Sequence, residues 1–256
     1  MSVLFLLTPA QMRRIRPHVP LSHGIPRVDD RRVLSGIIFV IRGGLRWRDA
    51  PPGYGPHKTL YNRFVRWSVQ PHLRRPRRRG RRARPANHRQ HAPEGPPHRG
   101  QPPQNGAPDR CIGRTKGGLN AKLHAVCDSQ GRPVVMMLSA GQMNDQKGAN
   151  ILAPLLPPAR KLIADRGYDS TPFRAALAER GIAACIPTKK NRKQPIPYDK
   201  ALYRQRHRIE IAFRRLKDWR RIATRYDQCA TIFFGAITLA AIVTFWLGQS
   251  VLSLVE

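Results

Sequence analysis

Apolar residues recur at helical spacing in three stretches near the start of the chain. The first follows Thr8, the second lies between Asp29 and Gly43, and the third covers residues 57–69. Apolar positions three and four residues apart, bounded by capping and turn residues, are typical of amphipathic helices. We therefore expect residues 1–70 to form a small all-α domain.

The third of these predicted helices has a basic and aromatic outer face. Lys58, Arg63 and Arg66 lie among its apolar residues. Three helices joined by turns, the last of them basic, are typical of a module that lies on DNA. A purely structural helical cap is the alternative.

From residue 119 onward the pattern changes to that of strands alternating with helices. Residues 119–126 alternate in polarity and residues 133–138 are wholly apolar, so the turn between them predicts a hairpin. Residues 161–164 form a short apolar strand that leads to Asp165, and residues 182–186 form another after a helix. This alternation predicts an α/β sheet in residues 111–256.

An uncharged apolar run covers residues 231–255. The run is nearly long enough to cross a bilayer, but threonines, glycines and Gln249 interrupt it. We expect a helix buried in the protein core, and a membrane anchor is the alternative.

Between residues 203 and 218, one acid lies among basic residues on a predicted helix. At about 100° per residue, four polar side chains fall within an arc of about 60°: Tyr203, Arg206, Glu210 and Lys217. The neighbouring face is apolar, so we expect the Glu210 carboxylate beside the core and out of solvent. The simpler alternative is that Glu210 only pairs with an arginine one helical turn away.

The composition indicates a polyanionic partner. The formal net charge is +32 and the isoelectric point is about 11.6. Binding to DNA or RNA releases counterions and relieves the self-repulsion of such a chain. The four cysteines are spread singly, without the spacing of a zinc site or of a disulfide framework, which indicates a reducing cytosol.

The spacing Tyr, two residues, Arg, three residues, Glu, six residues, Lys resembles the signature around the last catalytic acid of bacterial insertion-sequence transposases. The chain resembles the insertion-sequence-five type of DDE transposase over residues 1–70 and 111–247. The run from Gly43 to Pro52 and the run from Ile163 to Asp169 are also similar to that family. The resemblance implies an RNase H-like catalytic domain, a mixed sheet with helices, behind the helical N-terminal domain.

The resemblance also implies a role for each polar residue. Asp165 is the second catalytic acid and Glu210 the last, and both bind Mg²⁺ or Mn²⁺. Carboxylates that converge on two such ions suit phosphodiester transfer. Asp169 competes locally with Asp165 for the role of second acid, with turn capping as its alternative. Arg206 and Lys217 hold DNA phosphates, and Tyr203 contacts a strand end or positions the carboxylate.

The implied reaction is hydrolysis at the element ends, followed by attack of the freed 3′-hydroxyl on target DNA. The expected partners are the terminal inverted repeats of the element and the target DNA. We expect a homodimer or larger assembly on DNA, and a cytoplasmic, nucleoid-associated location without membrane contact.

Residues 71–110 do not fit the resembled family. They include eleven Arg and nine Pro but no Ile, Val, Met, Phe, Tyr or Trp, which predicts disorder. If the arginine codon is CGN, a one-base shift of the codons for residues 87–94 permits Ile or Thr at the first two positions, followed by Asp-Ser-Thr-His-Leu. The family carries such a strand here, and its aspartate is the first catalytic acid. We infer a frameshift near Val69 that is reversed near Gly106.

The expected consequence is that this copy is a transposase by ancestry but does not catalyse transposition. No acid in residues 71–110 lies in a strand-like context: Glu94 and Asp109 stand among prolines and glycines. Two alternatives remain at this point. One is a DNA-binding remnant that occupies element ends without cutting, and the other is a basic membrane-anchored protein.

Overall fold

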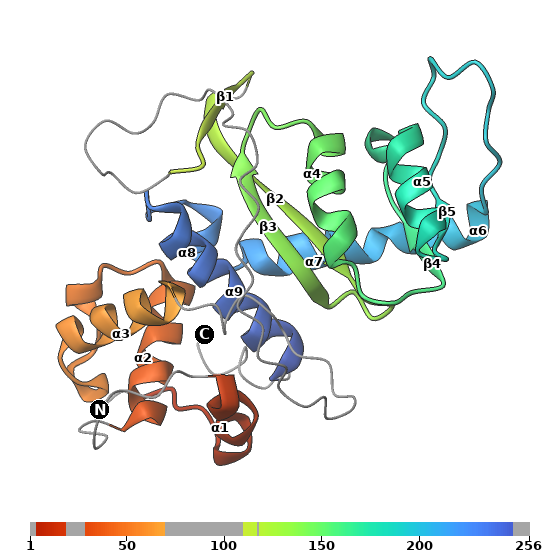
Figure 1. Cartoon of the computed structure of the whole chain (residues 1–256). Coiled ribbons are helices and arrows are strands. Elements are labelled where there is room, and N and C mark those ends of the chain that lie inside the picture. Colours follow the sequence, from red (N-terminus) through yellow and green to blue (C-terminus); the bar gives the residue numbers. More distant parts are fainter. Residues whose placement is uncertain (1–3, 19–28, 70–109, 117, 248–256) are drawn as a thin grey trace, which may run out of the picture.

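The computed structural model of the protein describes residues 4–18, 29–69, 110–116 and 118–247 (Figure 1). The helices are α1 (Pro9–Ile15), α2 (Asp30–Gly43), α3 (His57–Val69), α4 (Asp145–Leu152), α5 (Thr171–Glu179), α6 (Lys200–Tyr203), α7 (His207–Lys217), α8 (Arg220–Ala223) and α9 (Ala230–Trp246). The strands are β1 (Gly113–Thr115), β2 (Gly118–Cys127), β3 (Pro133–Ala140), β4 (Lys161–Ile163) and β5 (Ala183–Cys185). The mixed α/β content that we expected is confirmed.

The three N-terminal helices form where the apolar pattern places them. Thr8 and Gln11 make a reciprocal capping box at the start of α1, with N–H to side-chain oxygen distances of 2.8 and 3.2 Å. Helix α2 ends at Gly43, and the capping residue Gly44 has a φ of +65°, which suits glycine; a Cβ added there would lie 2.8 Å from the Cβ of Arg220. The end of the second helix was therefore predictable from the sequence.

The N-terminal helices share one hydrophobic core with the C-terminal helices. Helix α3 packs against α9, and α2 contacts both α8 and α9 (Figure 1). This core contains side chains from both ends of the chain, including Ile37, Phe64, Trp219 and Ile237. The division of the chain at residue 70 into two domains stays a prediction.

Helix α9 lies inside this core. Most of its residues are buried, from Phe233 to Thr244, which confirms the expected core helix. Within the described ranges, no helix combines the length and the apolar character needed to cross a membrane.

The strands form two separate sheets within the described residues. Strands β1, β2 and β3 are antiparallel neighbours in that order, and Leu123 pairs with Leu138. The predicted hairpin turn is confirmed, because Asp128 accepts hydrogen bonds from the backbone N–H groups of Gln130 and Arg132. Strands β4 and β5 are parallel, with Leu162 opposite Ala184.

Two expectations fall on residues that the structure does not describe. The predicted lack of order in residues 71–110, and the strand inferred from the shifted frame, lie outside the described residues except at Arg110. Both stay predictions.

Candidate active site

Asp165 follows the end of β4, as the sequence pattern predicts. Strand β4 ends at Ile163, and the next N–H, that of Ala164, still donates to the carbonyl oxygen of Cys185 in β5 at 3.3 Å. Asp165 then takes an extended conformation before a single 3₁₀ turn, Arg166–Tyr168. Its side chain is 52% exposed, so the carboxylate is open to solvent and to ligands.

Two of the four polar residues of the 203–218 stretch, Tyr203 and Arg206, contact Asp165, and Arg206 also contacts a third, Glu210. The Tyr203 hydroxyl donates to Asp165 Oδ1 at 3.3 Å, and Arg206 Nη1 donates to Oδ2 at 3.1 Å. The other guanidinium nitrogen of Arg206, Nη2, donates to Glu210 Oε1. Arg206 therefore lies between two carboxylates from distant parts of the sequence.

The helical geometry of this stretch differs from the expectation in one respect. Residues 204–206 form a 3₁₀ turn between α6 and α7, where each residue turns the chain by about 120°. Lys217 lies two turns beyond Glu210 on α7, is exposed, and does not line the cavity that Arg206 and Glu210 line. The structure thus brings together Tyr203, Arg206 and Glu210 but not Lys217.

The expectation that the Glu210 carboxylate lies out of solvent was wrong, because its side chain is 55% exposed. Ala212 and Leu216 do pack in the core, but Ile209 and Phe213 are only partly buried. Both of these apolar residues line a cavity, so the neighbouring face of α7 borders open space. Helical periodicity correctly grouped the residues but did not show what covers them.

Arg206 balances part of the negative charge of the two carboxylates. Burial lowers the pKa of Arg206, but the hydrogen bond that Arg206 donates to Glu210 and the negative charge of Asp165 outweigh it, so the pKa is raised overall. Burial and the Asp165 charge raise the pKa of Tyr203. Arg206 therefore stays cationic and Tyr203 stays a neutral hydrogen-bond donor at neutral pH.

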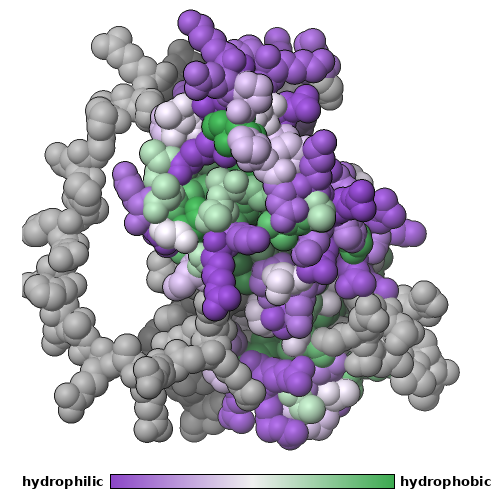
Figure 2. Space-filling model, turned by 90° about the vertical axis from the view of Figure 1, so that its right-hand side faces the viewer, coloured by the Kyte–Doolittle hydropathy of each residue, from purple (hydrophilic) through white to green (hydrophobic). Residues whose placement is uncertain are grey.

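A cavity of about 680 Å³ lies beside these residues. Strands β2 and β4 and helices α4 and α7 all contribute to its lining. Figure 2 shows the side of the molecule on which β4 and α5 lie, where hydrophobic residues gather within a hydrophilic surround. The lining combines apolar walls with a few polar groups, which is the usual character of a ligand site.

Sequence reasoning missed three polar residues of this cavity. Asp145, in the first turn of α4, forms an ion pair with Lys122 of β2 at 3.0 Å. His124 is buried and shares a 3.0 Å hydrogen bond with Ser139, and burial lowers its pKa. Asp145 follows the N-cap residue Asn144 and therefore looked like an ordinary helix-start residue. No spacing rule connects these residues to Asp165.

The site offers two carboxylates as ligands for divalent ions. Asp165 and Glu210 supply carboxylate oxygens, the ligand type that Mg²⁺ prefers. However, both already bind Arg206, and the described ranges contain no group of three or more His, Cys, Asp or Glu residues placed to hold a metal ion. The described residues thus supply part of a two-metal centre and do not complete it.

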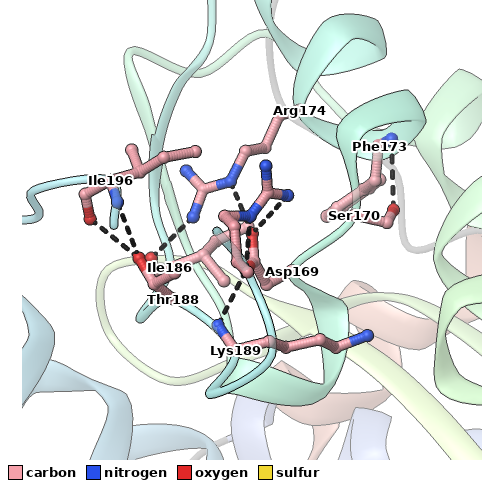
Figure 3. A network of polar contacts seen from close by, with 9 residues as sticks. Asp169, Ser170, Phe173, Arg174, Ile186, Thr188, Lys189 and Ile196 are labelled. Carbon is pink, nitrogen blue, oxygen red and sulfur yellow. Dashed lines mark hydrogen bonds and ion pairs between the residues drawn. The ribbon is translucent and has the colours of Figure 1, made fainter. Parts of the chain in front are cut away.

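Asp169 belongs to a buried hydrogen-bond network with Arg174, Lys189 and Arg192 (Figure 3). Its side chain is fully buried and accepts hydrogen bonds from Arg174 at 2.8 Å, from Arg192 and from the backbone N–H of Lys189. Burial acts to raise the pKa of Asp169, but these donors outweigh it and lower the pKa to about 2. Asp169 ties α5 to the basic loop near residue 190 and does not compete with Asp165.

We expect Asp169→Asn to destabilise the protein at neutral pH. The folded pKa of about 2 is below the ordinary value of 3.8, so the carboxylate stabilises the fold above about pH 4, and this stabilisation disappears as the pH falls toward 2. The free energy of unfolding should fall by about 2–3 kcal/mol at pH 7. Urea unfolding at pH 7 and pH 2 would measure it.

The exposed carboxylate of Asp218 provides the control, because Asp218→Asn removes a charge at the end of α7 without touching this network. The difference between Asp169→Asn and the unchanged protein should nearly vanish at pH 2. Equal stabilities at pH 7, or a difference that persists at pH 2, would contradict the structural role of Asp169.

The predicted basic face of α3 is only partly available to a ligand. Lys58 is exposed. Arg63 is 13% exposed and forms an ion pair with Asp30 at 3.0 Å. Arg66 is half-buried, and its Nε and Nη2 atoms are buried without a hydrogen-bond partner among the described residues. Of the three cations, Lys58 is the one best placed to meet a phosphate.

Comparison with known proteins defines the class. A family model described as "Transposase DDE domain" matches residues 86–245, more than half of the chain, so the chain belongs to the DDE transposases. A second model, "Putative transposase of IS4/5 family", matches residues 7–75. The first match begins within the segment that we expect to be out of frame.

Two relatives are similar to the chain. A Brucella ovis protein named "Putative transposase for insertion sequence element IS6501" is 36% identical over 130 residues, which cover 50% of this chain and 99% of the relative. A Burkholderia cepacia protein named "Putative transposase for insertion sequence element IS402" is 29% identical over 153 residues, 52% of this chain and 70% of the relative. No solved structure matches the chain.

Proposed function

We propose that this chain derives from a transposase that cuts and joins DNA at a carboxylate site formed by Asp165 and Glu210. Transposases act on DNA, and DDE transposase domains generally use divalent metal ions. The observation that carries the proposal is the meeting of Asp165 and Glu210 at one arginine, which lies 41 positions from Asp165 in the sequence. Two exposed carboxylates held so close to each other point to ligand binding.

Arg206 and Tyr203 are the positioning residues of this site. Arg206 fixes both carboxylates, and its charge balances part of their mutual repulsion. The Tyr203 hydroxyl donates to Oδ1 of Asp165, and Arg206 Nη1 contacts both oxygens of this carboxylate. When DNA enters, Arg206 can exchange a carboxylate partner for a phosphate oxygen, since guanidinium groups bind both. Lys217 contacts the DNA backbone further along α7.

The reaction class is metal-assisted phosphodiester hydrolysis and strand transfer. Bound divalent ions would supply activation of the nucleophile and stabilisation of the leaving oxygen, and Asp165 and Glu210 would be ligands in an RNase H-like arrangement. The ion would be Mg²⁺ or Mn²⁺. A third carboxylate is needed, and it is expected from the strand that the shifted frame encodes.

This copy is therefore proposed to be inactive. As written, residues 71–110 offer no acid in a strand-like sequence. Asp165 and Glu210 share the charge of Arg206, and within the described ranges no group of three or more His, Cys, Asp or Glu residues is placed to hold a metal ion. Two carboxylates are too few to hold two ions against the charge of the substrate.

DNA binding is proposed to survive this defect. The net charge of +32 does not depend on the missing aspartate. Lys58, Arg63 and Arg66 of α3 are the proposed N-terminal contacts, with Lys58 the most open. We propose the terminal inverted repeats and target DNA as ligands, a homodimer or larger assembly on them, and a nucleoid-associated location. A DNA-binding remnant without catalysis is the second candidate function for the chain as written.

Binding of Mn²⁺ tests the carboxylate site without DNA. In a frame-restored chain, whose reading frame is corrected between Val69 and Gly106, Asp165→Asn and Glu210→Gln should each weaken Mn²⁺ binding at least about tenfold, because each removes a proposed ligand. Electron paramagnetic resonance of free Mn²⁺ measures this. If neither substitution changes the affinity for Mn²⁺, the proposed metal site is wrong, and the DNA-binding remnant becomes the better account of the chain.

A further inference from the structure

Each of the two sheets has an unpaired edge within the described residues. Residues 121–127 of β2 pair with β3 along one edge, and β1 pairs only with residues 118–120 at the start of β2. Strand β4 pairs with β5 along one edge. Within the described ranges, no strand pairs with the second edge of residues 121–127 or of β4. Unpaired backbone N–H and C=O groups at such edges are ready to pair with another strand.

The cavity of about 680 Å³ lies between these edges. Residues 122–128 line one side of it and residues 161–165 line the other. Ala149 and Ala153 reach it from the α4 side, and Ile209 and Phe213 reach it from α7. Figure 1 shows α4 and α7 on different sides of the strands. Backbone edges on two sides and apolar helix faces on the other two are the surroundings of a central strand in an α/β sheet.

We propose that this cavity binds an extended β-strand supplied by a second polypeptide. The bound strand forms main-chain hydrogen bonds to β2 on one side and to β4 on the other, and joins the two sheets into one. Main-chain pairing of this kind supplies affinity, and the pockets for alternate side chains supply selectivity. The occupant is an apolar strand that carries one acid, such as Ile-Ile-Asp-Ser-Thr-His-Leu from an in-frame copy of the protein.

The composition of the chain itself argues for a strand from outside. Residues 71–110 contain nine prolines and eleven arginines. Proline cannot donate a ladder hydrogen bond and is confined to sheet edges, so it suits a strand with neighbours on both sides poorly. Arginine side chains likewise suit neither of the apolar faces formed by α4 and α7. An occupant of this cavity has to be apolar and free of proline.

The bound strand would also bring an acidic side chain to the carboxylate site. Asp165, Arg206 and Glu210 line the same cavity. An acid on the incoming strand therefore enters the space that borders both carboxylates. This last point rests on the proposed function, but strand binding itself does not.

The test uses the full chain and a fluorescein-labelled peptide, Ile-Ile-Asp-Ser-Thr-His-Leu. Fluorescence anisotropy should show saturable binding, and a peptide with proline at its fourth position should bind at least tenfold more weakly. Hydrogen exchange of the amides in residues 121–127 and 161–163 should slow when the first peptide binds. Equal affinity for the two peptides, absence of binding, or unchanged exchange at both edges would overturn the proposal.

Variants that fill the cavity provide the matched comparison. Ala149→Phe and Ala153→Phe each place a ring where the strand should lie, and each should weaken peptide binding at least tenfold. Ile151, on the same helix, is 49% exposed and does not line the cavity, so Ile151→Phe should leave binding unchanged. Full peptide affinity in both cavity-filled variants would contradict the proposal. If a variant fails to fold, the hydrogen-exchange measurement on the unchanged chain still tests the proposal.

A peptide with asparagine in place of its aspartate separates this inference from the proposed function. This peptide should still bind and slow exchange, since pairing is through the main chain. If both peptides bind but neither raises the affinity for Mn²⁺, the strand site stands and the metal site is wrong. If neither peptide binds while the frame-restored chain holds Mn²⁺ at Asp165 and Glu210, the strand site is wrong and the metal site stands.

Discussion

Replacing Asp165 with Asn, or Glu210 with Gln, in the frame-restored chain is expected to lower the rate of DNA cleavage about a thousandfold. Each substitution keeps the size of the side chain but removes a charged oxygen ligand. Loss of a metal ligand costs several kcal/mol of transition-state stabilisation, and each 1.36 kcal/mol is tenfold in rate. Single-turnover cleavage of an element-end duplex with Mg²⁺ would measure the effect.

Asp218→Asn is the matched control for this prediction. Asp218 is an exposed carboxylate immediately after α7, and it does not line the cavity. Its replacement changes the net charge by the same amount as Asp165→Asn, so any general effect of charge on DNA binding is shared. Full cleavage activity in Glu210→Gln would mean that α7 is a structural helix and that the chemistry lies elsewhere.

The affinity of the unrepaired chain for DNA is expected to fall about 10³-fold between 50 and 200 mM salt. The net charge of +32 requires neutralisation, and each phosphate contact releases a counterion. A protein that makes several phosphate contacts loses affinity by about this factor over this range. Fluorescence anisotropy with a labelled duplex, titrated at four salt concentrations, gives the slope.

Two variants of α3 distinguish a DNA contact from a structural cation. Lys58 is exposed, so Lys58→Ala should reduce the slope of log affinity against log salt concentration by about one. Arg63 is mostly buried against Asp30, so Arg63→Ala should lower stability more than it changes the slope. An affinity for DNA that does not depend on salt, or partitioning into vesicles in place of DNA binding, would exclude this account.

The sequence predicted the elements better than their environment. Apolar spacing located α2, α3, the β2–β3 hairpin and α9, because local periodicity decides which face of an element is buried. It also grouped Tyr203, Arg206 and Glu210, which do meet. It failed on the exposure of Glu210, since periodicity does not show that α7 borders a cavity.

Other features of the site depend on contacts between distant parts of the chain. The burial of Asp169 depends on Arg192, 23 positions away, and the ion pair of Arg63 depends on Asp30 in another helix. The ion pair between Lys122 and Asp145 joins a strand to a helix in the same way. No local pattern marks such pairs, so a basic or acidic residue in the sequence cannot be assigned to a ligand until its partners are known.

The most direct test of the central claim is single-turnover cleavage of an element-end duplex by the unrepaired and the frame-restored chains, side by side with Mg²⁺. The claim is that Asp165 and Glu210 form a catalytic site that this copy leaves without its third acid. The account predicts cleaved product from the frame-restored chain and none from the unrepaired one. Cleavage by the unrepaired chain at the rate of the frame-restored chain would contradict it.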